Sequence, residues 1–203
     1  KHLGDTHSTF IYDYYTRNGI SKGLKECFGN DIILISDVDE FPDIDKFKLF
    51  NGNLTVFKQV MFYFKLNLRV RNFDHDSGDG LWPGTRMLNF RSFKKINNVQ
   101  KIRNFKAKKY GWWRFDKPRL NIINYGGWHF RFFGSSKNLK HELENRSIGR
   151  GENILSSYSE SDINNIIKNR LPFTTEEERY EVYPLSKMPD FIKLNKEKYI
   201  NSL

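Results

Sequence analysis

The chain has 203 residues and a formal net charge of +10. This length suits one domain with a sizeable core, so we expect a single domain over residues 1–203. No apolar run reaches the ~18 residues of a membrane-spanning helix, and Cys27, the only cysteine, excludes an intrachain disulfide and a thiolate metal cluster. A lone cysteine fits a reducing compartment. We therefore expect a cytoplasmic protein whose basic surface attracts anionic partners.

The first half of the chain predicts helix, then strand, then helix, then strands. Apolar residues at helical spacing predict one or two helices between Asp5 and Cys27. Asp31–Ser36 holds four consecutive aliphatic residues, which predict a central strand buried on both faces. Asp43–Phe50 should form a short helix with an aspartate near its start. Residues 54–73 are rich in β-branched and aromatic residues, so they predict one long strand or two shorter ones.

The second half mixes loops, strands and helices. Residues 74–85 contain three glycines, one proline and three aspartates, which predict an irregular surface loop. Next we expect a strand over 86–90 and a basic helical region over 92–108. Two short strands over 121–134, interrupted by Gly126-Gly127, should follow. The pattern then turns helical, with serines at 135 or 136 and at 159 or 161 as N-caps. Such mixing predicts an α/β fold, with a mixed central sheet flanked by helices.

The stretch "NDIILISDVDEFPD" places Asp37 and Asp39 directly after the apolar run of the predicted strand. Ligands of α/β sheets bind beyond the carboxyl ends of strands. Two carboxylates one residue apart can face the same side and offer hard oxygen ligands to Mg²⁺ or Mn²⁺. The basic excess of the chain fits a phosphorylated ligand for that metal. The plain alternative is a solvated loop in which Asp43 caps the following helix.

Three motifs in this order, "ISDVDEFP", "LWPGTRMLNF" and "GGWHFRFFG", resemble glycosyltransferase family 17, the β-1,4-N-acetylglucosaminyltransferases with bacterial and viral relatives. "YYTRNGISKGL" is similar to the family's arginine-bearing helix and "MPDFIKLNKEKYINSL" to its C-terminal end, so the likeness covers most of the chain. The resemblance implies a GT-A-like nucleotide-diphospho-sugar transferase. It would move a sugar, N-acetylglucosamine from a UDP-sugar, to an acceptor hydroxyl on a glycan, with inversion.

The same resemblance assigns roles to individual residues. Asp37 and Asp39 form the Asp-x-Asp motif that holds Mn²⁺ or Mg²⁺ and the donor diphosphate, and His129 is a candidate third metal ligand. Arg17 would face the donor. Candidate substrate-binding residues complete the set: Trp82, Arg86 and Trp128. Against each role stands a plainer one, since a lone histidine and tryptophans often pack in cores and an arginine often lies on the surface.

An inverting displacement needs a general base that takes the proton of the acceptor hydroxyl, and a carboxylate is the usual choice. The candidates are Asp76 and Asp79 in the glycine-rich loop and Glu152 in "GRGEN". The family tends to carry His-x-Glu near the last of these, where this chain has Arg150 in place of the histidine. The plainer role of Glu152 is a carboxylate at the start of a helix.

The chain departs from the GT-A pattern at its start. Only about thirty residues precede the acidic motif, too few for a nucleotide-binding β-α-β segment. We therefore expect that upstream sequence is missing or that the base-binding half is reduced.

Two rival functions remain. A phosphatase of the haloacid dehalogenase type would use Asp37 as nucleophile, although Phe41 replaces the Thr or Val typical of that motif. A basic nucleic-acid-binding module would use residues 91–115, where Lys and Arg alternate with aromatic residues. In a glycosyltransferase the same segment would meet an anionic acceptor or allow peripheral membrane association, and no nucleic acid would be a partner.

Overall fold

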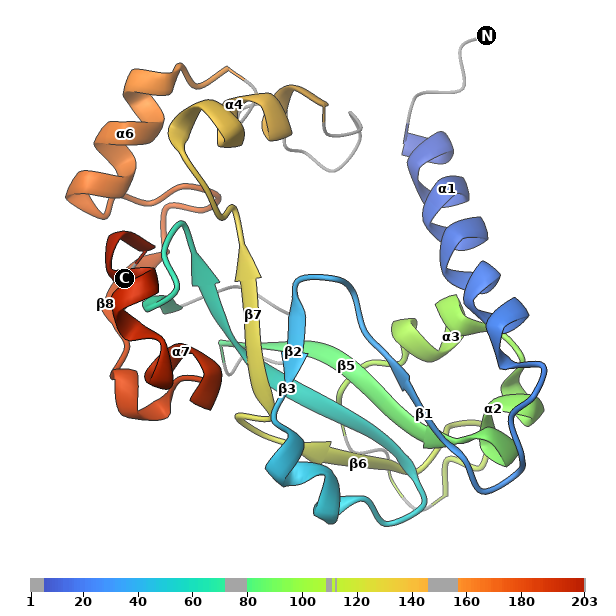
Figure 1. The fold of residues 1–203 in the computed structure, drawn as a ribbon. Coiled ribbons are helices and arrows are strands. Elements are labelled where there is room, and N and C mark those ends of the chain that lie inside the picture. Colours follow the sequence, from blue (N-terminus) through green and yellow to red (C-terminus); the bar gives the residue numbers. More distant parts are fainter. Residues whose placement is uncertain (1–5, 72–79, 109–110, 112, 146–156, 203) are drawn as a thin grey trace, which may run out of the picture. The chain divides into compact units, whose positions relative to one another are not determined.

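The computed structural model describes residues 6–71, 80–108, 111, 113–145 and 157–202 (Figure 1). These residues form two compact units, each assembled from separate stretches of the chain. The site unit contains 11–60 and 80–129, and the second unit contains 6–10, 61–71, 130–145 and 157–202. Three elements contribute to both units: α1 (Thr6–Gly19), β3 (Leu54–Tyr63) and β7 (Gly127–Arg131). The single domain expected over residues 1–203 stays a prediction.

The site unit is built on a sheet in which β5 (Leu81–Asn89) lies between β1 (Ile32–Ile35) and β3. Both neighbours of β5 are antiparallel to it. β6 (Leu120–Ile123) pairs with β3 in parallel, so the sheet is mixed. The short β2 (Glu40–Pro42) pairs with β7, with Glu40 opposite His129. The chain between β1 and β2 therefore leads from a strand paired with β5 to one paired with β7.

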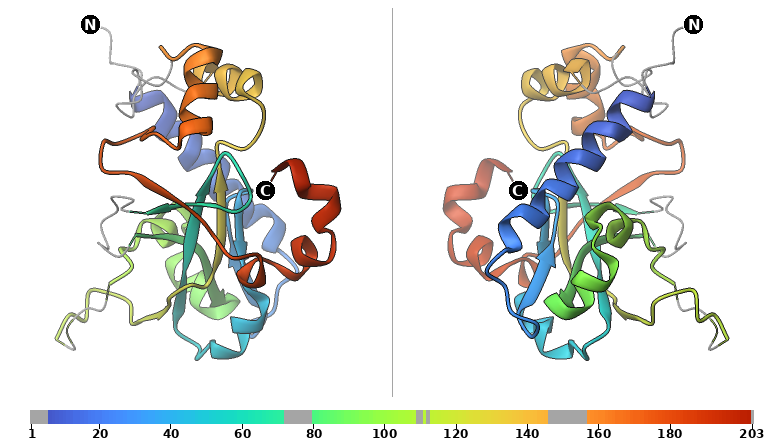
Figure 2. Two further views of the ribbon diagram at one scale, coloured as in Figure 1. Left: turned by 90° about the vertical axis from the view of Figure 1, so that its left-hand side faces the viewer. Right: turned by 90° about the vertical axis from the view of Figure 1, so that its right-hand side faces the viewer.

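Successive side chains of β5 point to opposite faces of this sheet, as they do along any strand. Leu88 packs with residues of β1, α2 (Phe90–Ile96) and α3 (Val99–Asn104), which lie beside the ends of β1 and β5 (Figure 2). Met87 belongs to a smaller cluster on which Phe47 of η2 (Ile44–Leu49) packs. The two helices and η2 thus cover different parts of the sheet.

The prediction that β1 is buried on both faces is wrong. Ile33 and Ile35 are buried, whereas Ile32 and Leu34 are 48% and 41% exposed. Among the described strands β1 pairs with β5 alone, so it is an edge strand. Its buried face meets α2 and α3, whereas η2 covers Met87 and its neighbours in β3 and β6. An unbroken aliphatic run here reflects one buried face only.

The predicted surface loop over 74–85 is also partly wrong, since 81–85 belong to β5 and the rest of the segment, apart from Gly80, lies outside the described residues. Trp82 and Pro83 pair with Gln59 and Lys58 of β3. A Cβ at Gly84 would clash with the Gln59 side chain. Gly84 therefore allows β3 to pack closely, and Pro83 lies within a paired strand. A segment rich in glycine and proline would otherwise be typical of a loop.

Other elements of the site unit confirm the sequence predictions. The expected N-terminal helices are α1 and η1 (Ile20–Leu24), and the basic region forms α2 and α3. Asp43 caps η2, accepting a hydrogen bond of 3.1 Å from the backbone nitrogen of Asp45. The two strands expected over residues 121–134 are β6, which begins one residue earlier, and β7, which begins at Gly127, the second glycine of the pair.

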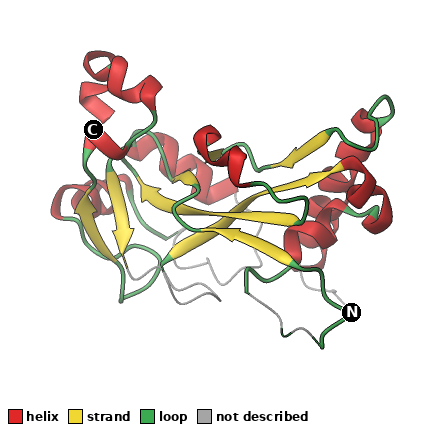
Figure 3. Cartoon of the chain, turned by 90° about the horizontal axis from the view of Figure 1, so that it is seen from below, coloured by secondary structure: helices red, strands yellow, loops and turns green. Residues whose placement is uncertain are grey.

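The second unit pairs β4 (Leu68–Arg71) with β8 (Arg179–Val182) in an antiparallel ladder. Ser159 caps one of its helices and forms a capping box with Asp162. The helix that Ser159 caps is α6 (Glu160–Asn169). The other described helices of this unit are α4 (Ser136–Asn145), η3 (Leu185–Lys187), α7 (Asp190–Leu194) and η4 (Lys196–Ser202). In the described part of the chain, no helix has the length and apolar character needed to cross a membrane. Strands and helices are interspersed throughout (Figure 3), so the fold is α/β, as predicted at that level.

Candidate functional site

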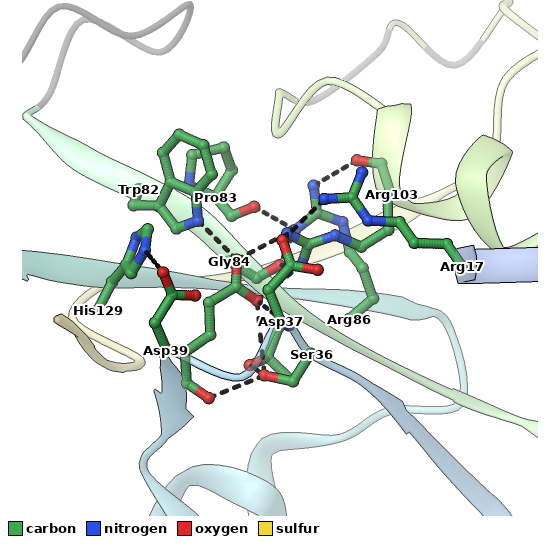
Figure 4. A network of polar contacts seen from close by, with 12 residues as sticks. Arg17, Ser36, Asp37, Asp39, Trp82, Pro83, Gly84, Arg86, Arg103 and His129 are labelled. Atoms are coloured by element: carbon green, nitrogen blue, oxygen red, sulfur yellow. Dashed lines mark hydrogen bonds and ion pairs between the residues drawn. The ribbon is translucent and has the colours of Figure 1, made fainter. Parts of the chain in front are cut away.

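The acidic loop between β1 and β2 lies in the site unit, and hydrogen bonds fix its path (Figure 4). The Oγ atom of Ser36 lies 2.7 Å from Oγ1 of Thr85 in β5 and donates to the backbone carbonyl of Glu40 at 2.9 Å. These bonds close the loop onto β5. The three acidic side chains that follow Ser36 consequently point to different partners.

Asp37 faces two arginines. Its Oδ2 atom accepts hydrogen bonds of 2.9 Å from Nη2 of Arg17 and 2.9 Å from Nη2 of Arg103. Arg17 comes from α1 and also donates to Oε1 of Gln100 in α3 at 3.0 Å. Two guanidinium groups therefore share one carboxylate oxygen, in a place where the Asp37 side chain is one-third exposed.

Glu40 is the buried centre of the site. Its Oε1 atom accepts from Nε1 of Trp82 at 2.7 Å and from Nη2 of Arg103 at 2.6 Å. Its Oε2 atom accepts from Nη1 of Arg103 at 2.8 Å and from the backbone nitrogen of Asp37 at 3.1 Å. The side chain is fully buried, and a buried carboxylate is tolerated when charged and polar donors satisfy it in this way. Glu40 therefore fixes both Arg103 and the backbone of the acidic loop.

The pKa values of the two arginines beneath the loop are shifted in opposite directions. Burial, and secondly the charge of Arg103, lower the pKa of Arg86 to about 9. Burial also lowers the pKa of Arg103, but the hydrogen bonds and charge of Glu40 outweigh it and raise that pKa above its ordinary value. Arg86 donates to the backbone carbonyls of Pro83, Gly84 and Arg103. The predicted substrate-binding Arg86 is thus a buried side chain that holds backbone in this structure.

Asp39 faces His129 of β7, with Oδ2 and Nε2 3.1 Å apart. His129 is 3% exposed and both of its ring nitrogens are buried; Nε2 contacts Asp39 without the angles of a hydrogen bond, and Nδ1 has no hydrogen-bond partner among the described residues. The indole ring of Trp82 packs beside the imidazole at a centroid distance of 5.0 Å. The resemblance predicted that Asp39 and His129 bind one metal ion; the structure places the two side chains next to each other, and the metal stays a prediction.

The donor atoms of this pair suit a divalent cation. A carboxylate oxygen next to an imidazole nitrogen that lacks a hydrogen-bond partner is a combination that transition metals such as Mn²⁺ bind. Asp37 does not complete the set as it stands, because its carboxylate contacts arginines. Within the described ranges no group of three His, Cys, Asp or Glu side chains is arranged to hold a metal. A three-residue site with Asp37, Asp39 and His129 would require Asp37 to leave its arginines.

The predicted tryptophans lie in different strands of the site unit. Trp82, in β5, is partly exposed, and its indole nitrogen is committed to Glu40. Trp128, in β7, is opposite Phe41 of β2 and is also partly exposed. Gly127 beside it has φ +142°, and a Cβ there would clash with the backbone of β2. The glycine pair thus admits a neighbouring strand at close range.

The structure brings together six of the predicted site residues and leaves three undescribed. One connected set of contacts joins Asp37, Arg17, Asp39, His129, Trp82 and, through the backbone carbonyls of Gly84 and Arg103, Arg86. The candidate bases Asp76, Asp79 and Glu152 lie outside the described residues. Sequence reasoning missed Glu40, Arg103 and Gln100. Glu40 directly follows the motif, which was a usable signal, whereas nothing in the sequence marks Arg103 out from other basic residues of its region.

Comparisons of the chain with protein-family models, with curated proteins and with solved structures found no match. The sequence motifs and the geometry of this site are therefore the observations from which a function can be inferred.

Proposed function

We propose that the chain is a metal-dependent glycosyltransferase of the GT-A type, which moves a sugar from a nucleotide diphosphate to an acceptor hydroxyl. One observation carries the proposal: acidic side chains at the end of β1 stand directly against the guanidinium groups of Arg17 and Arg103. A nucleotide diphosphate needs both kinds of partner, arginine donors for its oxygens and carboxylates that hold a cation beside it. The sequence motifs support UDP-N-acetylglucosamine as donor and a glycan as acceptor, with inversion.

The residues of the site divide the work. Asp39 and His129, joined by Asp37, would hold Mn²⁺ or Mg²⁺. When bound, such a cation neutralises the charge that develops on the leaving diphosphate. Arg17 keeps about a quarter of its side chain exposed, so its guanidinium is accessible to phosphate oxygens. Glu40 keeps the planar fork of Arg103 in one orientation, which reduces the entropy lost when an anion binds there.

The acceptor side of the proposal keeps its three candidate bases, Asp76, Asp79 and Glu152. One of them would take the proton of the acceptor hydroxyl as that oxygen attacks the sugar carbon and the bond to the diphosphate breaks. Trp82 and Trp128 are proposed to contact sugar faces, because partly exposed indole rings provide an apolar surface with a polar edge.

Thermal unfolding with a panel of nucleoside diphosphates and UDP-sugars, with and without Mn²⁺, tests the donor site. We expect a stabilising shift that needs both nucleotide and metal, and that Asp37→Asn and Asp39→Asn abolish. Asp45→Asn is the matched control, because Asp45 is an exposed carboxylate close to the same loop in sequence. No shift with any nucleotide, or an equal shift in all variants, would contradict the proposal.

The phosphatase alternative is separated by a second assay on the same samples. Release of inorganic phosphate from an aryl phosphate, together with an acid-stable phosphate on Asp37, would replace the transferase proposal with a phosphatase. Release of UDP from a UDP-sugar only when a glycan acceptor is present would support the transferase.

A further inference from the structure

The connection between α3 and β6 exposes large aromatic side chains. Trp113 is 63% exposed and Phe115 is 87% exposed. Phenylalanine has no polar group that water could solvate, so exposure of this degree is unfavourable in an isolated chain and marks a contact surface when other apolar groups lie beside it. We define the aromatic-basic loop as the described residues between 106 and 119.

The aromatic side chains stand among basic ones. Six basic residues and one acidic residue occur between positions 106 and 119 of the sequence. The exposed basic side chains among the described residues are those of Lys106, Lys108, Arg114 and Arg119. The single acidic residue, Asp116, accepts from Arg114 at 2.6 and 2.7 Å and lies 3.6 Å from Lys117. Its one negative charge leaves the loop strongly basic.

Two backbone turns present these side chains at the far end of the connection. The nitrogen of Arg114 donates to the carbonyl of Gly111 at 3.0 Å, and the nitrogen of Lys117 donates to the carbonyl of Arg114 at 3.2 Å. The connection, drawn in yellow-green in Figure 2, runs outward from the strands of the site unit. The exposed aromatic and basic residues therefore belong to a projecting loop.

We infer that the aromatic-basic loop seats the protein on an anionic lipid bilayer. Indole rings favour the depth of the lipid headgroups, and amphipathic surfaces place phenylalanine at the boundary with the acyl chains. Lysine and arginine are attracted to anionic headgroups, each raising membrane affinity about fivefold. A single-stranded nucleic acid instead needs a basic groove that follows its backbone past stacked aromatics. A projecting loop reaches a flat lipid surface without needing a groove. This inference does not depend on the proposed sugar transfer.

Vesicle flotation of the full chain tests the inference directly. Phosphatidylcholine vesicles are compared with vesicles containing roughly one-third phosphatidylserine, at low and at physiological salt. We expect flotation with the anionic vesicles only, and a loss of about tenfold or more in bound protein for Trp113→Ser/Phe115→Ser. Phe191→Ser is the matched aromatic control, since Phe191 is an exposed phenylalanine of α7 in the second unit.

A second pair of variants separates this loop from the net charge of the chain. Lys106→Gln/Lys108→Gln should reduce flotation about tenfold or more, whereas Lys137→Gln/Lys168→Gln, with the same change in charge at exposed positions of α4 and α6, should leave it nearly unchanged. An equal loss of flotation in the two double variants would overturn the inference. Failure of the native chain to float with anionic vesicles would overturn it as well. Binding to single-stranded RNA that falls with Trp113→Ser/Phe115→Ser, without flotation, would assign the loop to nucleic acid instead.

Discussion

Oδ2 of Asp37 lies 2.9 Å from Nη2 of Arg103, a residue separated from it by 66 positions in the chain. The same oxygen accepts a hydrogen bond from Arg17. The first carboxylate of the Asp-x-Asp motif is therefore neutralised by the protein itself. A cation that arrives without a phosphate group meets two positive charges beside its ligand, whereas a diphosphate would offer those arginines a replacement partner.

Arg17→Gln should consequently bind Mn²⁺ more tightly than the native chain in the absence of nucleotide. We expect a gain of about fifteenfold, the size of the repulsion between a dication and one guanidinium over ~5 Å in a water-like dielectric. The affinity for UDP in the presence of Mn²⁺ should fall. Electron paramagnetic resonance titration of free Mn²⁺ measures the first effect and calorimetry the second.

Lys22→Gln is the control for that experiment, because it removes a positive charge from the exposed η1 segment. It should change neither affinity by more than about twofold. If Arg17→Gln weakened Mn²⁺ binding, Arg17 would be supporting Asp37 as a metal ligand and the competition described above would be wrong.

Glu40→Gln should destabilise the chain strongly. The buried carboxylate compensates Arg103 and accepts from Trp82 and from the backbone of the loop. Removing one partner of a buried ion pair lowers the free energy of unfolding by about 3 to 5 kcal/mol, because the other charge stays buried without a partner. Urea unfolding of the native and variant chains measures the free energy of unfolding.

Glu181→Gln is the matched comparison for Glu40. Glu181 pairs with Arg69 and Arg71, but about a third of its side chain is exposed, so its loss should cost less than about 1 kcal/mol. Similar losses at Glu40 and Glu181 would mean that Glu40 is not the buried centre described here.

Gly127→Ala should loosen the pairing of β2 with β7. Gly127 has φ +142°, and a Cβ would clash with the carbonyl of Phe41. Strained backbone and a steric clash together should cost more than about 2 kcal/mol. Gly23→Ala, where no atom lies within 4 Å of the new Cβ, should be neutral or stabilising by up to about 1 kcal/mol. Thermal unfolding of both variants checks the difference.

Tyr63 makes stability fall at alkaline pH. Burial raises the pKa of its phenol to about 12, so between pH 10 and 12 the folded chain keeps a proton that the unfolded chain has lost. The stabilisation linked to this proton is full below the unfolded pKa and decreases as pH rises through that window. Between about pH 9.5 and 11 the native chain should lose about 1 kcal/mol relative to Tyr63→Phe.

Comparison of the native chain with Tyr63→Phe at pH 7 is the internal control, because the folded and the unfolded native chain then both keep the phenol proton. The Tyr63 hydroxyl is buried, and its polar contacts with Thr174 and Arg131 lower its pKa only in part, so at pH 7 Tyr63→Phe should change the free energy of unfolding by about 1 kcal/mol or less. Parallel stability curves from pH 7 to 11 would contradict the raised pKa.

The sequence by itself determined the local elements and the position of the acidic loop. The aliphatic run before Asp37 predicted a strand, and the carboxylates follow its end as expected. Serine and aspartate caps placed the starts of α6 and η2. These features depend on neighbouring residues, so a local pattern contains enough information to predict them. The resemblance of the motifs likewise marks His129 as a candidate ligand beside Asp37 and Asp39.

Only the tertiary structure decided what those side chains contact. Whether β1 is central or an edge strand depends on strands distant in sequence, and an aliphatic run looks the same in both cases. The bonds from Arg103 to Asp37 and Glu40 join α3 to the acidic loop, a pairing created by the packing of α3 against the sheet. Basic residues are numerous in this chain, so charge alone could not show which arginine is buried and bound. Long-range packing selects the partner, since the free energy of a buried ion pair depends on exclusion of water that no local segment can provide.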